Sequence, residues 1–162
     1  IKNSKKVINS TKIKFQNLTS TPTIVGTAEV ESAPQITGDT HLGGYSVILK
    51  KPGDSVTYTF DVANTGDIDA ELTTYTKATP VITATGSNNG ENDVQIVTDN
   101  LIYTLTYADG SPIEVGNELL HTLGNNTASL RLTVAYDLAA SELPQDEVTI
   151  DGLDITFIYG QK

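Results

Sequence analysis

The stretch that most constrains the fold is an alternation of large apolar and polar residues enclosed between two turn sequences, within residues 49–72 (LKKPGDSVTYTFDVANTGDIDAEL). Its apolar positions are Val56, Tyr58, Phe60 and Val62. Because successive side chains of a β-strand point to opposite faces, this period places all four on one buried face. Pro-Gly-Asp precedes the run and Asn-Thr-Gly-Asp follows it, and both sequences are typical of turns. We expect this stretch to be the core meander of an all-β protein.

Further short alternating runs lie at residues 12–18, 45–49, 72–76, 81–84, 101–107, 130–136 and 155–159. Turn formers separate these runs, and none has the period and length of a normal amphipathic helix. Residues 101–107 and 113–115 are expected to form a hairpin across the intervening Ala-Asp-Gly-Ser. The pattern predicts an antiparallel β-sandwich of about 9–11 short strands. Jelly-roll and immunoglobulin-like wirings both remain open.

The composition narrows the class of protein. A chain of 162 residues is most simply one domain. The absence of cysteine excludes a disulfide framework and thiolate zinc sites. No stretch approaches the ~18 consecutive apolar residues of a membrane-spanning helix. The chain begins with Ile1 rather than methionine, and we expect it to be a processed or partial product.

The charge is unevenly placed along the chain. Residues 1–14 hold five lysines and no acid, whereas residues 15–162 hold the other five basic residues and all twenty acids, a net charge of −15. We therefore divide the chain into a basic N-terminal arm, residues 1–18, and a single β-sandwich domain, residues 19–162. The acidic body argues against a nucleic-acid partner, which requires a basic surface.

The arm combines lysines with apolar residues in an order that suits a strand given to another sheet. Its candidate partner-binding residues are Val7, Ile8, Lys12, Ile13, Lys14 and Phe15. An extended segment that joins an open sheet edge gains main-chain hydrogen bonds and places alternate side chains in pockets. If that edge belongs to the next copy, the contact is head-to-tail and builds a filament. The other interpretation is that residues 12–18 form the domain's own first strand.

The sequence predicts no catalytic residue. His41 and His121 are the only histidines, both are expected in loops, and neither a G-x-S-x-G nor an H-E-x-x-H motif is present. Asp67, Asp69 and Glu71 surround one turn and offer the oxygen ligands that calcium prefers. A second group of acids and amides occupies residues 88–93, but neither group matches an EF-hand loop. We therefore expect no cofactor, with calcium as a weak candidate at residues 67–71.

Four segments together resemble a group of secreted bacterial proteins: KIKFQNL, residues 49–72, LIYTLTYADGSPIEVG and LPQDEVTIDGLDITFIYGQK. They are similar to the camelysin/TasA type of biofilm-matrix fibre subunit of Gram-positive and related bacteria. The resemblance implies a jelly-roll-like sandwich, export, and assembly by insertion of an N-terminal strand into a neighbour. Camelysins have also been classed as metallopeptidases, but no zinc motif in this chain supports carrying that activity over.

Taken together, these features predict a non-enzymatic extracellular β-sandwich that forms a homopolymer in a surface filament, pilus or matrix fibre. One alternative is a monomeric cell-surface adhesin or stalk domain that presents a binding loop such as residues 85–93. Another is a secreted hydrolase that uses His41 or His121.

Overall fold

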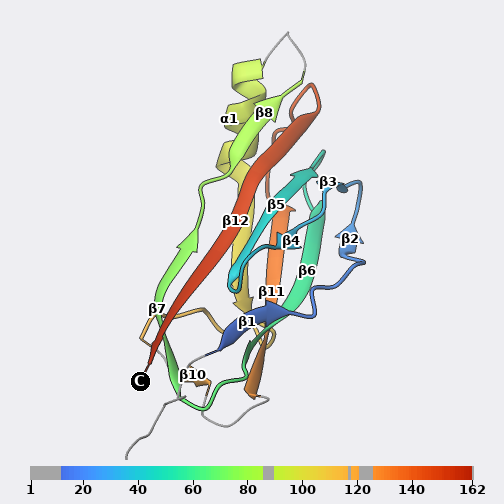
Figure 1. Ribbon diagram of the computed structural model, residues 1–162. Helices are drawn as coiled ribbons and strands as arrows, with labels where there is room; N and C mark the ends of the chain where they lie inside the picture. The colour runs from blue at the N-terminus through green and yellow to red at the C-terminus, as the bar shows by residue number, and fades with distance from the viewer. Residues whose placement is uncertain (1–11, 86–89, 117, 121–125, 162) are drawn as a thin grey trace, which may run out of the picture.

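The computed structural model describes residues 12–85, 90–116, 118–120 and 126–161 and confirms the predicted antiparallel β-sandwich (Figure 1). Sheet A has the order β1-β6-β11-β9, with β2 also on β6, and sheet B has the order β10-β7-β12-β5-β3, with β4 on β5 and β8 on β12. The strands of sheet A are β1 (Ile13–Gln16), β2 (Thr23–Val25), β6 (Ser55–Asn64), β9 (Leu101–Tyr107) and β11 (Asn126–Tyr136). Those of sheet B are β3 (Glu29–Ser32), β4 (Gln35–Ile36), β5 (His41–Ile48), β7 (Ala70–Lys77), β8 (Val81–Ala84), β10 (Glu118–Leu120) and β12 (Val148–Gln161).

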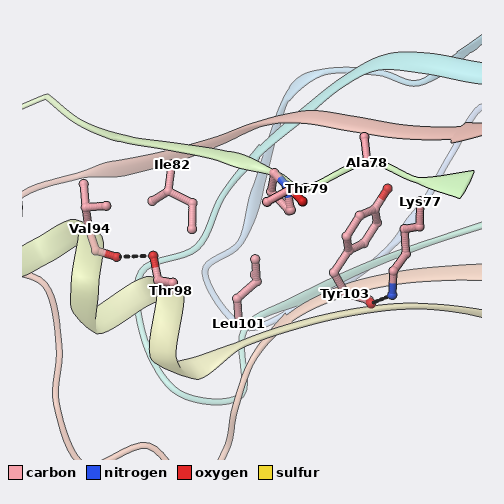
Figure 2. Close-up of a pocket in the computed structure, with 9 residues that line it drawn as sticks. Lys77, Ala78, Thr79, Ile82, Val94, Thr98, Leu101 and Tyr103 are labelled. Carbon is pink, nitrogen blue, oxygen red and sulfur yellow. Dashed lines mark hydrogen bonds between the residues drawn. The ribbon is translucent and has the colours of Figure 1, made fainter.

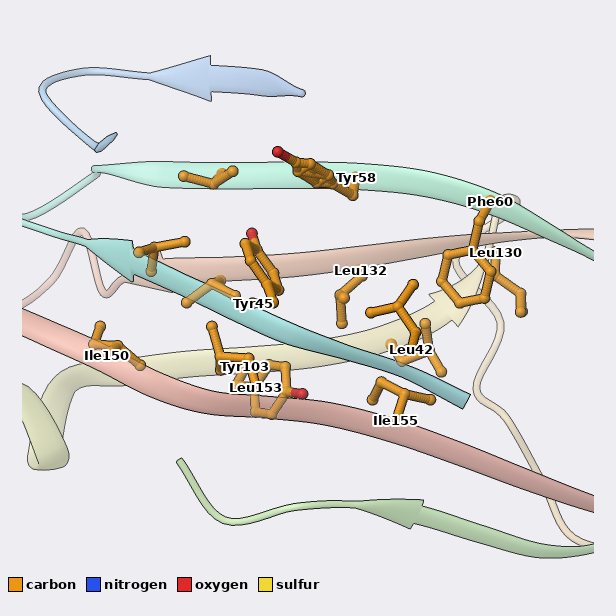
Figure 3. Close-up of a cluster of buried hydrophobic side chains, with 14 of the residues drawn as sticks. Leu42, Tyr45, Tyr58, Phe60, Tyr103, Leu130, Leu132, Ile150, Leu153 and Ile155 are labelled. Carbon is orange, nitrogen blue, oxygen red and sulfur yellow. The ribbon is translucent and has the colours of Figure 1, made fainter. Parts of the chain in front are cut away.

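The core lies between the inner faces of the two sheets, and both contribute large side chains to it (Figure 3). The predicted run on β6 provides four of them, since Val56, Tyr58, Phe60 and Val62 are all buried. Leu130 and Leu132 of β11 lie beside them, and Ile150, Leu153 and Ile155 of β12 and Leu42 of β5 come from sheet B. Tyr45 and Tyr58 meet edge to face across the sandwich with ring centroids 5.2 Å apart. Side chains of both sheets thus form one continuous cluster of buried residues.

Residues 49–72 cross between the sheets and are not the meander that the sequence suggested. β5 and β7 belong to sheet B and β6 belongs to sheet A, so the chain changes sheet at both turn sequences. Alternation shows which face of a strand is buried but carries no information about which sheet holds it.

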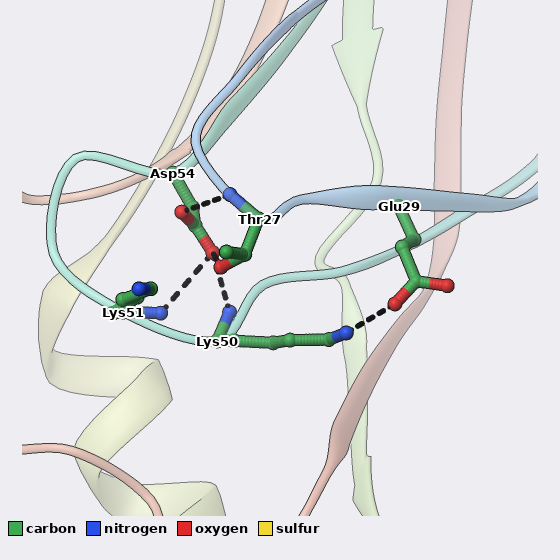
Figure 4. A network of polar contacts seen from close by, with 5 residues as sticks. All are labelled: Thr27, Glu29, Lys50, Lys51 and Asp54. Carbon is green, nitrogen blue, oxygen red and sulfur yellow. Dashed lines mark hydrogen bonds and ion pairs between the residues drawn. The ribbon is translucent and has the colours of Figure 1, made fainter.

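The turn before β6 is organised by the carboxylate of Asp54, which is 1% exposed (Figure 4). It accepts hydrogen bonds from Thr27 N (2.8 Å), Thr27 Oγ1 (2.7 Å), Lys50 N (2.9 Å) and Lys51 N (3.2 Å). Burial alone would raise the pKa of Asp54, but these four donors favour the carboxylate and hold its pKa below the ordinary value. The Pro-Gly-Asp sequence therefore fixes the crossing between the sheets and also holds the segment before β3.

A helix, α1 (Gly90–Asn100), lies where the sequence suggested a polar loop and no normal helix. Asp93, Ile96 and Val97 are its buried residues, a spacing that places them on one face. Glu91 and Asp93 lie in its first turn, where negative charge favours the helix dipole. Within the described residues no helix is long and apolar enough to cross a membrane.

The expected hairpin of residues 101–107 and 113–115 is wrong in its second half. The turn is present, because Gly110 N donates to Tyr107 O and Tyr107 N donates to Ser111 O. A single bridge between Thr106 and Pro112 follows, and β9 forms its ladder with β11 instead. The long alternating run on β11 offers a full-length partner, whereas Pro112 lacks the N–H that a ladder needs.

Candidate interaction site at the first strand

β1 lies at the edge of sheet A and pairs with β6 of the same chain (Figure 1). The pairing is antiparallel and matches Ile13 with Asn64, Phe15 with Val62 and Gln16 with Asp61. Thr65 N also donates to Lys12 O at 2.9 Å. In the isolated chain, residues 13–16 thus form the domain's own first strand.

The two apolar side chains of β1 fill sites in the core. Ile13 is 8% and Phe15 is 4% exposed. The Phe15 ring meets the ring of Phe60 at a centroid distance of 4.9 Å and that of Phe157 at 5.2 Å, both edge to face. Phe15 N also donates to Asp39 O at 2.7 Å, on the side of β1 away from β6. The site that receives Phe15 is therefore an aromatic pocket with contributions from both sheets.

Residues 17–22 connect β1 to β2, which pairs with β6 further along the same edge. Asn17 has a φ of 56°, a left-handed conformation that ends the strand. Its side-chain amide donates to Asp61 Oδ2 at 2.9 Å, and Thr19 N donates to Thr59 O at 2.9 Å. Gln16 and Thr23 are seven residues apart in the sequence, whereas their partners on β6, Asp61 and Thr57, are only four residues apart. The connection is therefore three residues longer than the segment of β6 beside it.

The remaining residues predicted to bind a partner divide into two groups. Lys12 and Lys14 are exposed. Val7 and Ile8, like the lysines at 2, 5 and 6, lie outside the described residues. The sequence missed Phe60, Phe157 and Asp39 O as the receiving groups, because alternation marks a residue as buried without naming its neighbours.

The opposite edge of sheet A is formed by β9, and a lysine covers part of it (Figure 2). Lys77 Nζ donates to Tyr103 O at 2.5 Å and lies 5.0 Å from the centre of the Tyr103 ring. Partial burial lowers the pKa of Lys77. A groove of about 500 Å³ runs beside it between β8, α1 and β9, lined mainly by Ala78, Pro80, Ile82, Val94 and Leu101. Lys77 belongs to β7 of sheet B, and a charged side chain that covers an edge strand discourages the addition of a further strand.

No family model matches the chain, and the comparisons with curated proteins and with solved structures give no significant match.

The calcium candidates lie along the connection before β7 and at its start. Asp67 is exposed, and Asp69 and Glu71 are partly buried. One carboxylate oxygen of Asp69, Oδ1, is buried without a hydrogen-bond partner. In the described part of the chain, no three acidic or histidine side chains are placed to hold a metal ion. In the second acidic group, Asp93 accepts from Gln145 N (2.8 Å) and Asp146 N (3.0 Å), which gives it a structural role.

His41 begins β5 and is not in the loop that the sequence suggested. Its Nε2 lies 2.6 Å from Asp154 Oδ2, and its Nδ1 lies 2.5 Å from Thr37 Oγ1. Both ring nitrogens are thus engaged, and the Asp154 contact fastens β5 to β12. His121 lies outside the described residues. A hydrolase that uses either histidine is an alternative that only an activity measurement tests.

Proposed function

We propose that the protein is the structural subunit of an extracellular filament, pilus or biofilm-matrix fibre, built head-to-tail by donation of the N-terminal strand to the neighbouring copy. The observation that carries the proposal is β1 itself. It is a four-residue terminal strand whose Phe15 fills an aromatic pocket, and it is attached through the longer connection. A short strand that has buried side chains and is joined to the domain by a connection of more than the minimum length is suited to exchange between identical copies.

In such an exchange, the neighbour offers the same receiving site that the chain offers to its own strand. The edge of β6, the pocket beside Phe60 and Phe157, and the Asp39 carbonyl would make the same contacts with a donated strand. The contacts at the pocket are the same before and after exchange, so they cancel in the free energy of exchange. The balance between monomer and polymer therefore depends on concentration, the connection between β1 and β2, and any new surface between the copies. Because the donating and receiving surfaces differ, the contact is head-to-tail, and the chain of copies continues as a filament when the rotation between neighbours does not close a ring.

Charge supports the same proposal. The arm carries +5 over residues 1–14 and the rest of the chain −15, so a donated arm approaches a body of opposite charge. The resemblance to camelysin/TasA-type fibre subunits agrees with an extracellular, non-enzymatic role. The proposal does not require a cofactor.

A pair of cysteines across β1 and β6 tests strand exchange directly, since the natural chain has none. Gln16 and Asp61 are direct cross-strand partners, and such positions lie within disulfide reach. In a Gln16→Cys/Asp61→Cys variant, oxidation of preformed polymer should give covalent ladders on denaturing gels. Oxidation of the monomer should link β1 covalently to β6 of its own chain and so prevent assembly. Polymer that forms from locked monomers would overturn the proposal.

Deletion of residues 1–14 gives a second test that needs no chemistry. The shortened chain should form no filaments under conditions in which the full chain does, as judged by negative-stain images. Normal filaments from the deletion variant would show that the arm is not the donor.

The leading alternative is a monomeric adhesin or stalk domain, and the pairing of β1 with its own β6 is what such a domain would show. Size-exclusion chromatography of the full chain over a wide concentration range separates the two functions. A monomer at every concentration, with no filament in native material, favours the adhesin.

A further inference from the structure

Exposed apolar side chains gather at the end of sheet A that lies away from β1. Ile24 is 46%, Val25 51%, Ile102 39% and Leu138 79% exposed. Only four further large apolar side chains of the described residues are comparably exposed, and they are Val81, Val115, Leu143 and Ile158. Scattered apolar residues on a surface need no explanation, but a contiguous group marks a contact surface.

The strand register places Val25 and Ile102 in one row across sheet A, with Ser55 and Ala135 between them. Val25 pairs with Ser55, Ser55 with Ala135, and Ala135 with Ile102. Directly opposed residues of antiparallel strands share a face, so this row crosses sheet A on one side. Their neighbours Val56 and Val134 are buried, which places the row on the outer face.

Leu138 extends this row beyond the end of the sheet. Its Cδ1 would be 3.0 Å from a Cβ placed on Gly53, two residues before Ser55. Asp137 N donates to Asn100 O at 2.8 Å, which holds the segment beside the start of β9 and Ile102. We call Val25, Ile102, Ala135 and Leu138 the apolar end patch; Ile24 pairs with the buried Val56 and so belongs to the opposite face of the sheet.

The segment that joins β1 to β2, residues 17–22, meets β2 at Thr23, two residues before Val25 of this patch. β1 pairs with residues 61–64 of β6, whereas Thr23–Val25 pairs with residues 55–57. Figure 1 shows β1 and β2 at different levels along β6. Suppose that β1 pairs with β6 of a neighbour while β2 remains paired with β6 of its own chain. Seven residue steps of the donor chain then join its Gln16, seated in the receiving copy, to its Thr23. That length spans at most about 25 Å. The β6 edge of the receiving copy must therefore lie within about 25 Å of Thr23, at the end of the donor's sheet A that carries the patch.

From this geometry we infer that the apolar end patch is the surface of the donor on which the receiving copy of the same chain docks. The inference rests on the proposed strand exchange and identifies the second contact between neighbours. A patch of four side chains is too small to hold two copies together alone, since stable interfaces bury about 1,200–2,000 Å². It stabilises the exchanged state over the monomer because the monomer leaves the patch in water. This is the new surface that the proposed exchange requires.

Single cysteines test the inference in the full chain, which otherwise has none. Leu138→Cys reports on the patch, and Ile158→Cys is the matched control, exposed at 53% on the outer face of β12 in sheet B. Each variant is prepared reduced, separated into monomer and pelletable polymer, and treated with a maleimide reagent. The rate of labelling is compared between the two fractions.

Slower labelling of Leu138→Cys in polymer than in monomer, by about tenfold or more, supports the inference, because a packed thiol reacts only when the contact opens. The Ile158→Cys rate should be the same in both fractions. Polymer in which Leu138→Cys reacts as fast as in monomer overturns the inference and leaves strand exchange standing. Disulfide-linked dimers of Leu138→Cys would mean that patch meets patch, and this symmetric contact also overturns it. Failure of both variants and of the natural chain to form polymer removes the proposed function and the inference together.

Discussion

The ring of Phe15 meets the ring of Phe157 edge to face, with centroids 5.2 Å apart and planes at 77°, and so joins the first strand of sheet A to the longest strand of sheet B. Phe157 also contacts Tyr75 and Tyr159 in the same geometry, at 5.3 and 6.0 Å. Phe15 thus completes an aromatic cluster that spans the sandwich. Removal of β1 leaves an apolar site that must be filled, either by the same strand or by one from a neighbour.

Phe15→Ala should lower the free energy of unfolding by about 3–5 kcal/mol, the usual cost of truncating a buried phenylalanine. Urea unfolding followed by tyrosine fluorescence measures the change. Lys14→Ala is the matched control, since Lys14 lies on the same strand with an exposed side chain, and its unfolding midpoint should hardly move. Equal midpoints for the two variants would mean that β1 is not bound in the isolated chain.

Gly26 and Gly38 allow the cost of a close contact to be separated from the cost of a backbone conformation. Both have a φ of 73°, but a Cβ at Gly26 would overlap Asp54 Oδ1, whereas a Cβ at Gly38 meets nothing within 4 Å. Gly38→Ala should cost about 1–2 kcal/mol for the left-handed backbone. Gly26→Ala should cost about 1–3 kcal/mol more, because the Asp54 cradle must shift. Equal thermal midpoints for the two variants would show that Asp54 and its hydrogen-bond donors can shift without a measurable loss of stability.

Asp54 should make stability depend on pH in the acid range. Its pKa in the folded protein is lower than the ordinary value of 3.8, so the unfolded chain binds a proton first. The stabilisation from its hydrogen bonds is therefore complete above that ordinary value and is lost as the pH falls through the lower folded pKa. Asp54→Asn should cost about 2–3 kcal/mol at pH 7, since an amide replaces an ionised acceptor of several hydrogen bonds. Urea titrations should show this difference shrink toward pH 2, and a difference that is constant with pH would contradict the assignment.

The sequence predicted the fold class because alternation on β6, β9 and β11 is a local property of each strand. Helix α1 was missed because its apolar residues Val94, Ile96 and Val97 are few and follow a polar run. The three- and four-residue spacing of Ile96 and Val97 from Asp93, with Glu91 also in the first turn, was the available signal. The assignment of β5 and β7 to sheet B depends on long-range packing, which no local pattern records.

At the candidate site, alternation predicts that Ile13 and Phe15 point inward, and both are buried. Their role as anchors in a neighbouring copy stays a prediction. The sequence did not identify their surroundings. Phe157 lies more than a hundred residues away in the chain, and the contribution of Asp39 is a main-chain carbonyl, which carries no side-chain signature. The apolar end patch likewise emerges only from register, since Val25, Ala135 and Ile102 belong to three distant segments.

Lys77→Met should make the β9 edge of sheet A more prone to aggregate. The Lys77 amine occupies Tyr103 O, and a methionine keeps most of the apolar volume but can neither donate to that carbonyl nor repel a strand by charge. Thioflavin T kinetics under mild shaking should show a shorter lag than for the natural chain. Lys51→Met is the control for loss of one positive charge, because Lys51 contributes its main-chain N–H to Asp54 and lies away from β9. Equal lags for the two variants would show that Lys77 does not protect the edge.

Shortening the connection between β1 and β2 should prevent strand exchange and keep the protein monomeric. Three residues are surplus between Gln16 and Thr23, because the paired segment of β6 is three steps shorter. A chain without Asn17, Thr21 and Pro22 keeps Thr19 opposite Thr59, where it already donates, and lets residues 13–25 run along β6 as one continuous strand. In that variant β1 can leave only if β2 leaves with it, so exchange loses its hinge. Analytical ultracentrifugation should find a monomer at concentrations at which the natural chain and a Pro22→Ala control form polymer. Polymer of normal yield from the shortened chain would mean that the strand which joins neighbours is not tethered at residues 17–22.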